Sequence, residues 1–358
     1  MRDAKLLPSL EGLRFIASMA VVANHFIPYA YADIRIERLS VAVDLFFVIS
    51  GIVIANQYQG RMRSLADYAD FLQRRLARIY PLHLATLLFY VVIGLLLSRG
   101  LLHVNDPDKY RFSLLLLNAL LIQAWNPFDY LISFNRVSWS ISAEFFVYLL
   151  FPLIAWIIGR GFGVAATFVS ACLALGVGVA YFVYNIDLVS LNWQFGIIRA
   201  LPGFALGVLL STYREEIAAV LRPDLARTSV HVLLALLPVL MLADSYNYIL
   251  LPLAYALVAC AFVCDISRTP TVAAWEPLSS LGYLTYSIYM LHPLVATVFL
   301  TAIAPKLLGT SMPMMFVAVG IGTLITLGLS VLSYRYFEQP MRQRINALSL
   351  TPRAAAAG

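Results

Sequence analysis

Long apolar stretches alternate with short polar segments along almost the whole chain. A bilayer core of about 30 Å is crossed by about 20 apolar helical residues, so each stretch predicts a membrane-spanning helix. The spans expected from this pattern are residues 10–30, 40–57, 79–98, 137–158, 163–183, 195–212, 229–243, 247–265, 279–302 and 313–336. The fold class is therefore all-α, a polytopic integral membrane protein with about ten transmembrane helices.

The segment Ser113–Ala124 is also apolar but is too short for a span. Its length suits an interfacial or re-entrant helix. The first apolar run is too long for the core of a signal peptide and contains ionisable residues, so we expect it to remain as the first span. We expect one transmembrane domain over residues 1–345 and a disordered tail over 346–358.

The composition supports the same class. Hydrophobic residues make up 61% of the 358 residues and charged residues only 12%, whereas soluble domains carry about 25% charge. Most of the 25 Lys and Arg residues fall in segments that are predicted to lie on the same side of the membrane as the N-terminus. The positive-inside rule then predicts that both termini are cytoplasmic. The net charge of +6 is explained by topology and does not indicate nucleic-acid binding.

The three cysteines, Cys172, Cys260 and Cys264, all lie in apolar segments. An odd number cannot form a closed set of disulfides, and buried cysteine is commonly a small hydrophobic residue. Cys260 and Cys264 share a helix face, but no His or carboxylate cluster accompanies them. We therefore predict no metal site.

Arg14 and His25 lie within or beside the first apolar stretch, eleven residues apart. At about 100° per residue they fall within roughly 20° of each other on one helix face, about 16 Å apart along the axis. An ionisable residue inside a span is costly and indicates a functional site. Asp44 is expected at a similar depth on the second span, where it could fix the His25 tautomer. The alternative is a structural polar pair that holds two helices together.

Arg74, Arg75 and Arg78 precede Pro81 at the expected cytoplasmic start of the third span. Arg75 and Arg78 share a helix face, Pro81 suits an early helical position, and helix N-termini attract anions. These residues could hold phosphates at the membrane surface. Taken alone, topology and binding of anionic lipid headgroups explain them better.

Ser140, Glu144 and Tyr148 follow one another at intervals of four residues, which forms one polar stripe on a predicted span. Such a stripe should face the protein interior. Ser50, next to Gly51, could line a ligand channel, although small-residue packing of helices explains this pair somewhat better. In the last span, Glu338 lies in a predicted helix stop at the inner interface. The candidates for lining a substrate channel are Ser50, Trp139, Ser140, Ser142, Tyr148, Tyr286, Ser287 and His292.

These motifs occur in one order that resembles the membrane acyltransferase-3 family, the family of O-antigen, exopolysaccharide and Nod-factor acetyltransferases. The matching pieces are Glu11-Gly12-Leu13-Arg14 with His25, Val43-Asp44-Leu45-Phe46-Phe47-Val48-Ile49-Ser50-Gly51, Arg75-x-x-Arg78-Ile79-x-Pro81, Trp139-Ser140-Ile141-Ser142-x-Glu144, Ser287-Ile288-Tyr289-x-x-His292 and Phe337-Glu338-x-Pro340. Some members carry an additional C-terminal esterase-like domain, so the resemblance is to the stand-alone members.

The resemblance implies transfer of an acyl group, usually acetyl, from cytoplasmic acyl-CoA to a hydroxyl of a sugar or polysaccharide. It also implies a bacterial cytoplasmic membrane as the location, with membrane lipid, acyl-CoA and a carbohydrate as partners. Arg14, Arg74, Arg75 and Arg78 would bind CoA, and His25 would act as general base. Glu144 would bind the sugar or serve as a second acid or base. A covalent acyl-His25 intermediate is the alternative to direct transfer.

A secondary transporter or a polysaccharide-export partner would also contain intramembrane His, Asp, Glu and Arg residues. A transporter could show inverted repeats and paired broken helices, and no convincing similarity exists between the two halves of this chain. An export partner would need a hydrophilic path but no CoA-binding arginines. The acceptor, the acyl length and the oligomeric state have no signal in the sequence.

Overall fold

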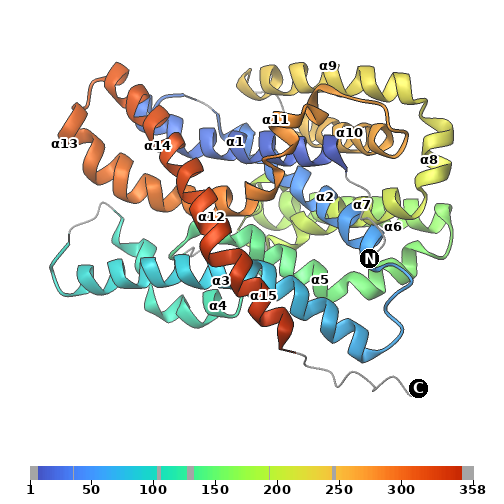
Figure 1. Cartoon of the computed structure of the whole chain (residues 1–358), viewed down its shortest axis with the longest axis horizontal. Helices are drawn as coiled ribbons and strands as arrows, with labels where there is room; N and C mark the ends of the chain where they lie inside the picture. The colour runs from blue at the N-terminus through green and yellow to red at the C-terminus, as the bar shows by residue number, and fades with distance from the viewer. Residues whose placement is uncertain are drawn as a thin grey trace.

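A computed structural model describes residues 7–34, 36–102, 106–126, 133–192, 194–243 and 247–348. Every regular element in these ranges is helical (Figure 1). The longer helices are α1 Pro8–Ala30, α2 Ala42–Tyr58, α3 Leu65–Ser98, α5 Trp139–Ile158, α6 Phe162–Gly178, α7 Ile197–Thr212, α9 Pro223–Leu242, α10 Asn247–Ile266, α12 Thr285–Val295 and α14 Met312–Ser333. The shorter ones are α4 Leu115–Ala119, α8 Arg214–Val220, α11 Glu276–Ser279, α13 Ala304–Leu308 and α15 Gln339–Ala347.

The predicted class is confirmed. Within the described residues, nine helical segments are long and apolar enough to cross a membrane, and α7 is a shorter apolar helix. Each of these ten segments overlaps one of the ten predicted spans, so the chain is a multi-pass membrane protein. The segment after Ser113 forms only the five-residue helix α4, which is too short to cross a bilayer. The side of the membrane on which the termini lie stays a prediction, and the expected tail from residue 349 lies outside the described ranges.

The third span begins earlier than predicted. Helix α3 starts at Leu65, because the side chain of Ser64 caps it by accepting a hydrogen bond from the Asp67 backbone N–H at 3.1 Å. Pro81 therefore lies inside the helix, and the expected helix N-terminus beside the arginines is wrong. Arg75 and Arg78 lie several turns into α3, so any anion binding there depends on their side chains.

The helix stop predicted at residues 336–340 is also wrong. After α14 the chain makes a π-helical turn, Tyr334–Glu338, and continues as α15. Pro340 is the second residue of α15, directly after the π-helical turn, so it does not end the helix. The side-chain amide of Gln73 on α3 donates to the Ile345 carbonyl at 2.6 Å. Helix α15 therefore lies against α3 (Figure 1).

Helices α2 and α7 approach closely through glycine. A Cβ on Gly51 of α2 would lie 2.2 Å from the Phe204 carbonyl oxygen, and one on Gly207 of α7 would lie 2.0 Å from the Val48 carbonyl oxygen. This contact is the small-residue packing expected at Ser50-Gly51. It places α2 so that Ser50, the neighbour of Gly51, lines an internal cavity.

Replacing Gly51 by alanine is expected to destabilise the protein by about 1–3 kcal/mol, because the added methyl group has to push two helix backbones apart. The matched control is Gly320→Ala on α14, where a Cβ would meet no atom within 4 Å. Thermal unfolding of both variants in detergent compares the two positions. A Gly51→Ala protein that unfolds at the wild-type temperature would show that the helices separate at no cost.

Candidate active site

One cavity of about 230 Å³ lies among α1, α2, α3, α5 and α12. Three arginines, Arg14, Arg75 and Arg78, line one part of it, which we call the basic end. Ser140 and Tyr289 line another part, which we call the far end. Ser140 and Tyr148 both line the cavity and are two helical turns apart on α5, so the cavity follows that helix for about 12 Å.

The basic end holds more positive than negative charge. Arg14 forms an ion pair with Glu11 at 3.1 Å, and both residues line the cavity. The Arg75 Nη2 donates to Gln57 and to the Tyr58 hydroxyl, each at 3.3 Å, and its buried Nε has no partner among the described residues. Arg78 lies close enough to Arg14 and Arg75 to be repelled by both charges. An anion at this end would relieve that repulsion.

Arg74 does not line the basic end, so its predicted position beside Arg75 and Arg78 in one site is wrong. Its Nε donates to the Asp70 carboxylate at 2.8 Å, one turn earlier on the same helix. This local pair directs the side chain to a separate surface groove that also contains Asp67. Because both partners are about half exposed, the pair adds little stability.

The middle of the cavity carries one carboxylate held by two hydroxyl groups. The Ser50 hydroxyl donates to Glu144 at 2.7 Å, and the Tyr148 hydroxyl donates to the same oxygen. Ser50 and Tyr148 are also within 3.3 Å of each other. Both donors hold the Glu144 carboxylate toward the cavity, where it can accept hydrogen bonds from a ligand hydroxyl. The predicted positions of Ser50, Glu144 and Tyr148 on the cavity wall agree with this arrangement.

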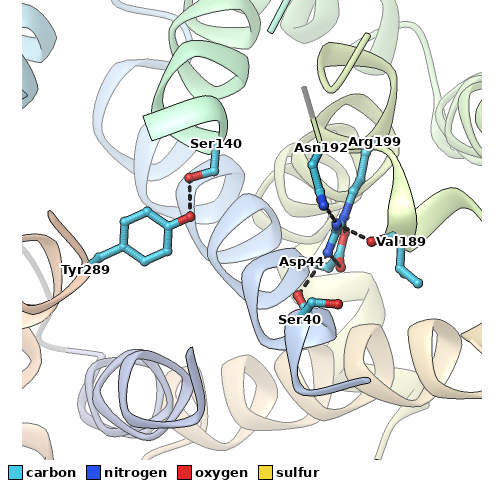
Figure 2. Close-up of polar contacts among 7 residues, drawn as sticks. All are labelled: Ser40, Asp44, Ser140, Val189, Asn192, Arg199 and Tyr289. Atoms are coloured by element: carbon cyan, nitrogen blue, oxygen red, sulfur yellow. Dashed lines mark hydrogen bonds and ion pairs between the residues drawn. The ribbon is translucent and has the colours of Figure 1, made fainter. Parts of the chain in front are cut away.

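The two residues of the far end are joined by a hydrogen bond. The Ser140 hydroxyl on α5 donates to the Tyr289 oxygen on α12 at 2.8 Å (Figure 2). Tyr289 in turn donates to the Val137 carbonyl at 3.0 Å. One turn earlier on α12, the Tyr286 hydroxyl donates to the Ile79 carbonyl. Tyr286 and Ser140 therefore line the cavity as predicted.

His25 lies beyond the far end and is not among the residues that line the cavity. Its ring centroid is 4.9 Å from that of His292, and the His292 centroid is 6.0 Å from that of Tyr289. His25 Nδ1 is 2.8 Å from the Val21 carbonyl oxygen. Because a carbonyl only accepts, Nδ1 carries the hydrogen, and in a neutral ring Nε2 has the lone pair.

Asp44 does not orient His25, so the predicted pairing is wrong. Both Asp44 oxygens accept from Arg199, at 3.1 Å from Nε and 2.8 Å from Nη2. The two side chains are almost fully buried, with exposures of 1% and 0%. The Val21 carbonyl takes the place at His25 Nδ1 that was expected for the carboxylate.

Arg199 uses every N–H that it has. Besides the two bonds to Asp44, it donates to the Ser40 carbonyl at 2.9 Å, to Asn192 Oδ1 at 2.7 Å and to the Val189 carbonyl (Figure 2). Its guanidinium also lies 5.1 Å from the centroid of the Trp139 ring. A buried charge is tolerated where it is paired and fully hydrogen-bonded. This cluster fixes the start of α2 against α7.

Four predicted channel residues do not line the cavity: Trp139, Ser142, Ser287 and His292. Trp139 covers Arg199 instead. The Ser142 hydroxyl donates to the Leu121 carbonyl at 2.7 Å, which ties the segment after α4 to α5. These side chains face neighbouring helices or segments because each finds a local hydrogen-bond or ring partner there.

The other two corrections concern α12. The Ser287 hydroxyl donates to the buried Glu338 at 2.6 Å, while the position of Glu338 at the inner membrane interface stays a prediction. His292 is fully buried, with Nδ1 3.1 Å from the Ile288 carbonyl oxygen. Its Nε2 has no hydrogen-bond partner among the described residues.

The described residues contain no group of three or more His, Cys, Asp or Glu side chains that could hold a metal ion. The three cysteines are buried and free. The functional groups that line the cavity are three guanidinium groups, the carboxylates of Glu11 and Glu144, and hydroxyl groups, with two imidazoles nearby.

Comparison with known proteins identifies the family. The chain is 40% identical over 157 residues to an acyltransferase of Streptomyces mycarofaciens, MdmB, over 41% of this chain and 38% of that protein. It is 25% identical to a putative peptidoglycan O-acetyltransferase of Bacillus subtilis, YrhL, over 94% of this chain and 55% of the relative. It is 24% identical to the O-acetyltransferase OatA of Staphylococcus aureus, over 96% of this chain and 58% of that protein.

The matches thus cover between about two-fifths and three-fifths of the length of these relatives. No solved structure matches the chain. The model of the acyltransferase-3 family, described as an acyltransferase domain, matches residues 7–335. The chain is therefore a member of the acyltransferase-3 family of membrane proteins.

Proposed function

We propose that this protein is a membrane O-acyltransferase that moves an acyl group, most simply acetyl, from acyl-CoA to a hydroxyl of a carbohydrate. The observation that carries the proposal is the cavity between an arginine cluster and the Ser140–Tyr289 pair. Beyond that pair lie two histidines, with the His292 ring beside Tyr289 and the His25 ring beside His292. The relatives, which include named O-acetyltransferases, favour acetyl as the group. We place the protein in the bacterial cytoplasmic membrane.

The donor would enter at the basic end. CoA has several negative charges on its nucleotide and a long neutral arm, which match an arginine-lined entrance and a narrow, largely apolar passage. Arg75 and Arg78 would bind phosphate, and Arg14 would lie beside the arm. For the thioester to reach His25, it would have to pass Ser140 and Tyr289, because His25 is an exposed residue outside the cavity.

The transfer step would use His25 Nε2 as the base. The acceptor oxygen bonds to the thioester carbonyl carbon, its proton passes to Nε2, the carbon–sulfur bond breaks, and the proton ends on the departing thiolate. The Val21 carbonyl supports this role because it holds the hydrogen on Nδ1. In the alternative route, Nε2 itself attacks the thioester carbon, the carbon–sulfur bond breaks and the thiolate of CoA departs, which leaves an acyl-imidazole. The acceptor oxygen then takes the acyl group, and its proton ends on the thiolate. Glu144 would bind the acceptor or act as a second acid or base.

The function is tested in a deletion strain of the source bacterium. We expect mass spectrometry of its envelope glycans to show the loss of one acetyl mass from a carbohydrate species, and a plasmid carrying the wild-type gene to restore it. Unchanged glycan acetylation, together with no transfer of label from radiolabelled acetyl-CoA to glycan by isolated membranes, would contradict the proposal.

Replacing Arg78 by alanine is expected to weaken CoA binding about tenfold or more, because one charge-assisted phosphate contact contributes about 1.5–3 kcal/mol. Arg74→Ala is the matched control on the same helix, since Arg74 is paired with Asp70 and lines a different groove. Isothermal titration with CoA of the purified proteins compares the two. Equal affinities of the two variants would remove Arg78 from the donor site.

A further inference from the structure

A second, smaller hollow adjoins the cavity at the basic end. Arg78 and Tyr286 line both spaces, so the two share a wall. The remaining walls of the hollow are Tyr283 of the turn before α12, Tyr334 and Glu338 of the π-helical turn, and Gln339 and Arg342 of α15. Its volume of about 30 Å³ has room for one small group only.

The C-terminal helix α15 supplies the second cation of the hollow. Gln73 of α3 donates to the Ile345 carbonyl of α15 and thereby holds this helix against α3. Arg342, one turn before Ile345, lines the hollow, whereas Arg344 on the same helix is exposed and does not. Helix α15 thus brings one of its two arginines to the basic end.

The charges of the hollow suit an anion. Arg342 lies close enough to Arg78 for the two positive charges to repel each other. The one carboxylate in the walls, Glu338, accepts from Ser287 at 2.6 Å and from Ser333 at 2.7 Å at a single oxygen, and it also attracts Arg78. The hollow thus has two positive charges against one negative charge. Two guanidinium groups facing one small space form a typical site for phosphate, which each can bind through two N–H groups.

The position of the hollow suits one phosphate group of the donor, the 3′-phosphate. The far end, where the thioester would react, contains Tyr289, and the hollow begins at Tyr283, on the opposite side of Tyr286 along the chain. The 3′-phosphate on the ribose is the phosphate group of CoA most distant from the thioester. With the arm of CoA in the cavity, the 3′-phosphate would therefore lie on the Tyr283 side of Arg78, in the hollow.

We propose that Arg342 and Arg78 form a subsite for the 3′-phosphate of the acyl-CoA donor, so that α15 completes the donor site. This inference rests on the proposed function and adds the residue by which CoA would be distinguished from nucleotides that lack this phosphate. The same two arginines could otherwise hold the phosphate of a lipid headgroup, and the experiment separates these two sources.

The test uses the full chain in nanodiscs of zwitterionic phosphatidylcholine and measures binding of CoA and of dephospho-CoA, which lacks the 3′-phosphate. We expect the wild type to bind CoA about tenfold more tightly than dephospho-CoA. Arg342→Ala is expected to lose this preference, because its affinity for CoA falls while its affinity for dephospho-CoA stays unchanged. Arg344→Ala is expected to keep the preference. Arg342→Lys should retain part of the preference, because it keeps the charge but loses the two-pronged contact.

The same preference for CoA over dephospho-CoA in the wild type and the Arg342→Ala variant would overturn the subsite while leaving the proposed function intact. An affinity for CoA that rises or falls with added anionic phosphatidylglycerol in the wild type, but not in Arg342→Ala, would assign the arginine to lipid and overturn the subsite as well. A wild-type protein that binds neither nucleotide would refute the proposed function itself. Thermal unfolding at the wild-type temperature confirms that each variant is folded.

Discussion

Replacement of His25 by glutamine is expected to reduce acetyl transfer about 100- to 10,000-fold, the usual contribution of a positioned general base. Glutamine has a similar reach and hydrogen-bonding capacity but no basic ring nitrogen. CoA affinity should stay unchanged, because His25 does not line the cavity that would hold the donor. Transfer of label from radiolabelled acetyl-CoA to glycan in isolated membranes measures the rate, and titration with CoA measures the affinity.

His231→Gln is the matched control. His231 is an exposed residue of α9 that accepts a hydrogen bond from the Val272 backbone N–H at 3.1 Å. It does not line the cavity. Wild-type transfer by the His231→Gln protein and loss of transfer by the His25→Gln protein are the expected pair of results. Full activity of a well-expressed His25→Gln protein would exclude both general-base catalysis and an acyl-histidine intermediate at this residue.

Replacement of Arg199 by alanine is expected to destabilise the protein by about 3–5 kcal/mol, the range seen when one partner of a buried ion pair is removed. Asp44 would remain buried with a charge that nothing else neutralises. The carbonyls of Ser40 and Val189 and the Asn192 side chain would also lose their donor. We expect a much lower unfolding temperature in detergent, and little protein in the membrane.

Two further variants serve as controls for Arg199→Ala. Arg227→Ala removes the surface pair with Asp224, whose atoms are 3.4 Å apart and substantially exposed, so it should change stability by less than about 1 kcal/mol. Replacing Asp44 by leucine and Arg199 by methionine together should recover much of the loss, because apolar groups leave no buried charge. An Arg199→Ala protein as stable as Arg227→Ala would show that the buried cluster contributes nothing to folding.

The membrane spans could be predicted because the bilayer imposes one length on every apolar helix. The ten predicted stretches correspond to helices of the structure, including the short α7. The rule applies only inside the hydrocarbon core. The polar first turns of α3, which begin at the Ser64 cap, and the whole of α15 lie beyond apolar stretches, so hydropathy gave no sign of them.

The partner of Asp44 could not be predicted from the sequence for a different reason. Apolar spans give the depth of a residue, and both His25 and Arg199 could lie at the depth of Asp44. They do not give the direction in which each helix faces. Charge balance was an available signal, since Arg199 is a cation in an apolar segment and requires an anion nearby. A histidine can be neutral and then requires no anion, and His25 has a backbone carbonyl as its partner.

The cavity residues were easier to find where one helix carried several of them. The interval of four between Ser140, Glu144 and Tyr148 places all three on one wall of the cavity. Arg342 could not be found in this way, because it reaches the basic end only through the docking of α15 on α3. Its neighbour two residues along, Arg344, has the same side chain and does not line the hollow.

The central claim, that the acyl donor lies between the arginines and His25, is tested most directly by a cryo-EM structure of the protein with acetyl-CoA bound. The account predicts the phosphates of the nucleotide against Arg75, Arg78 and Arg342, with the arm passing Glu144 and the thioester at Tyr289 beside the two histidines. A donor bound in the opposite direction, or one whose sulfur points away from His25, would contradict it.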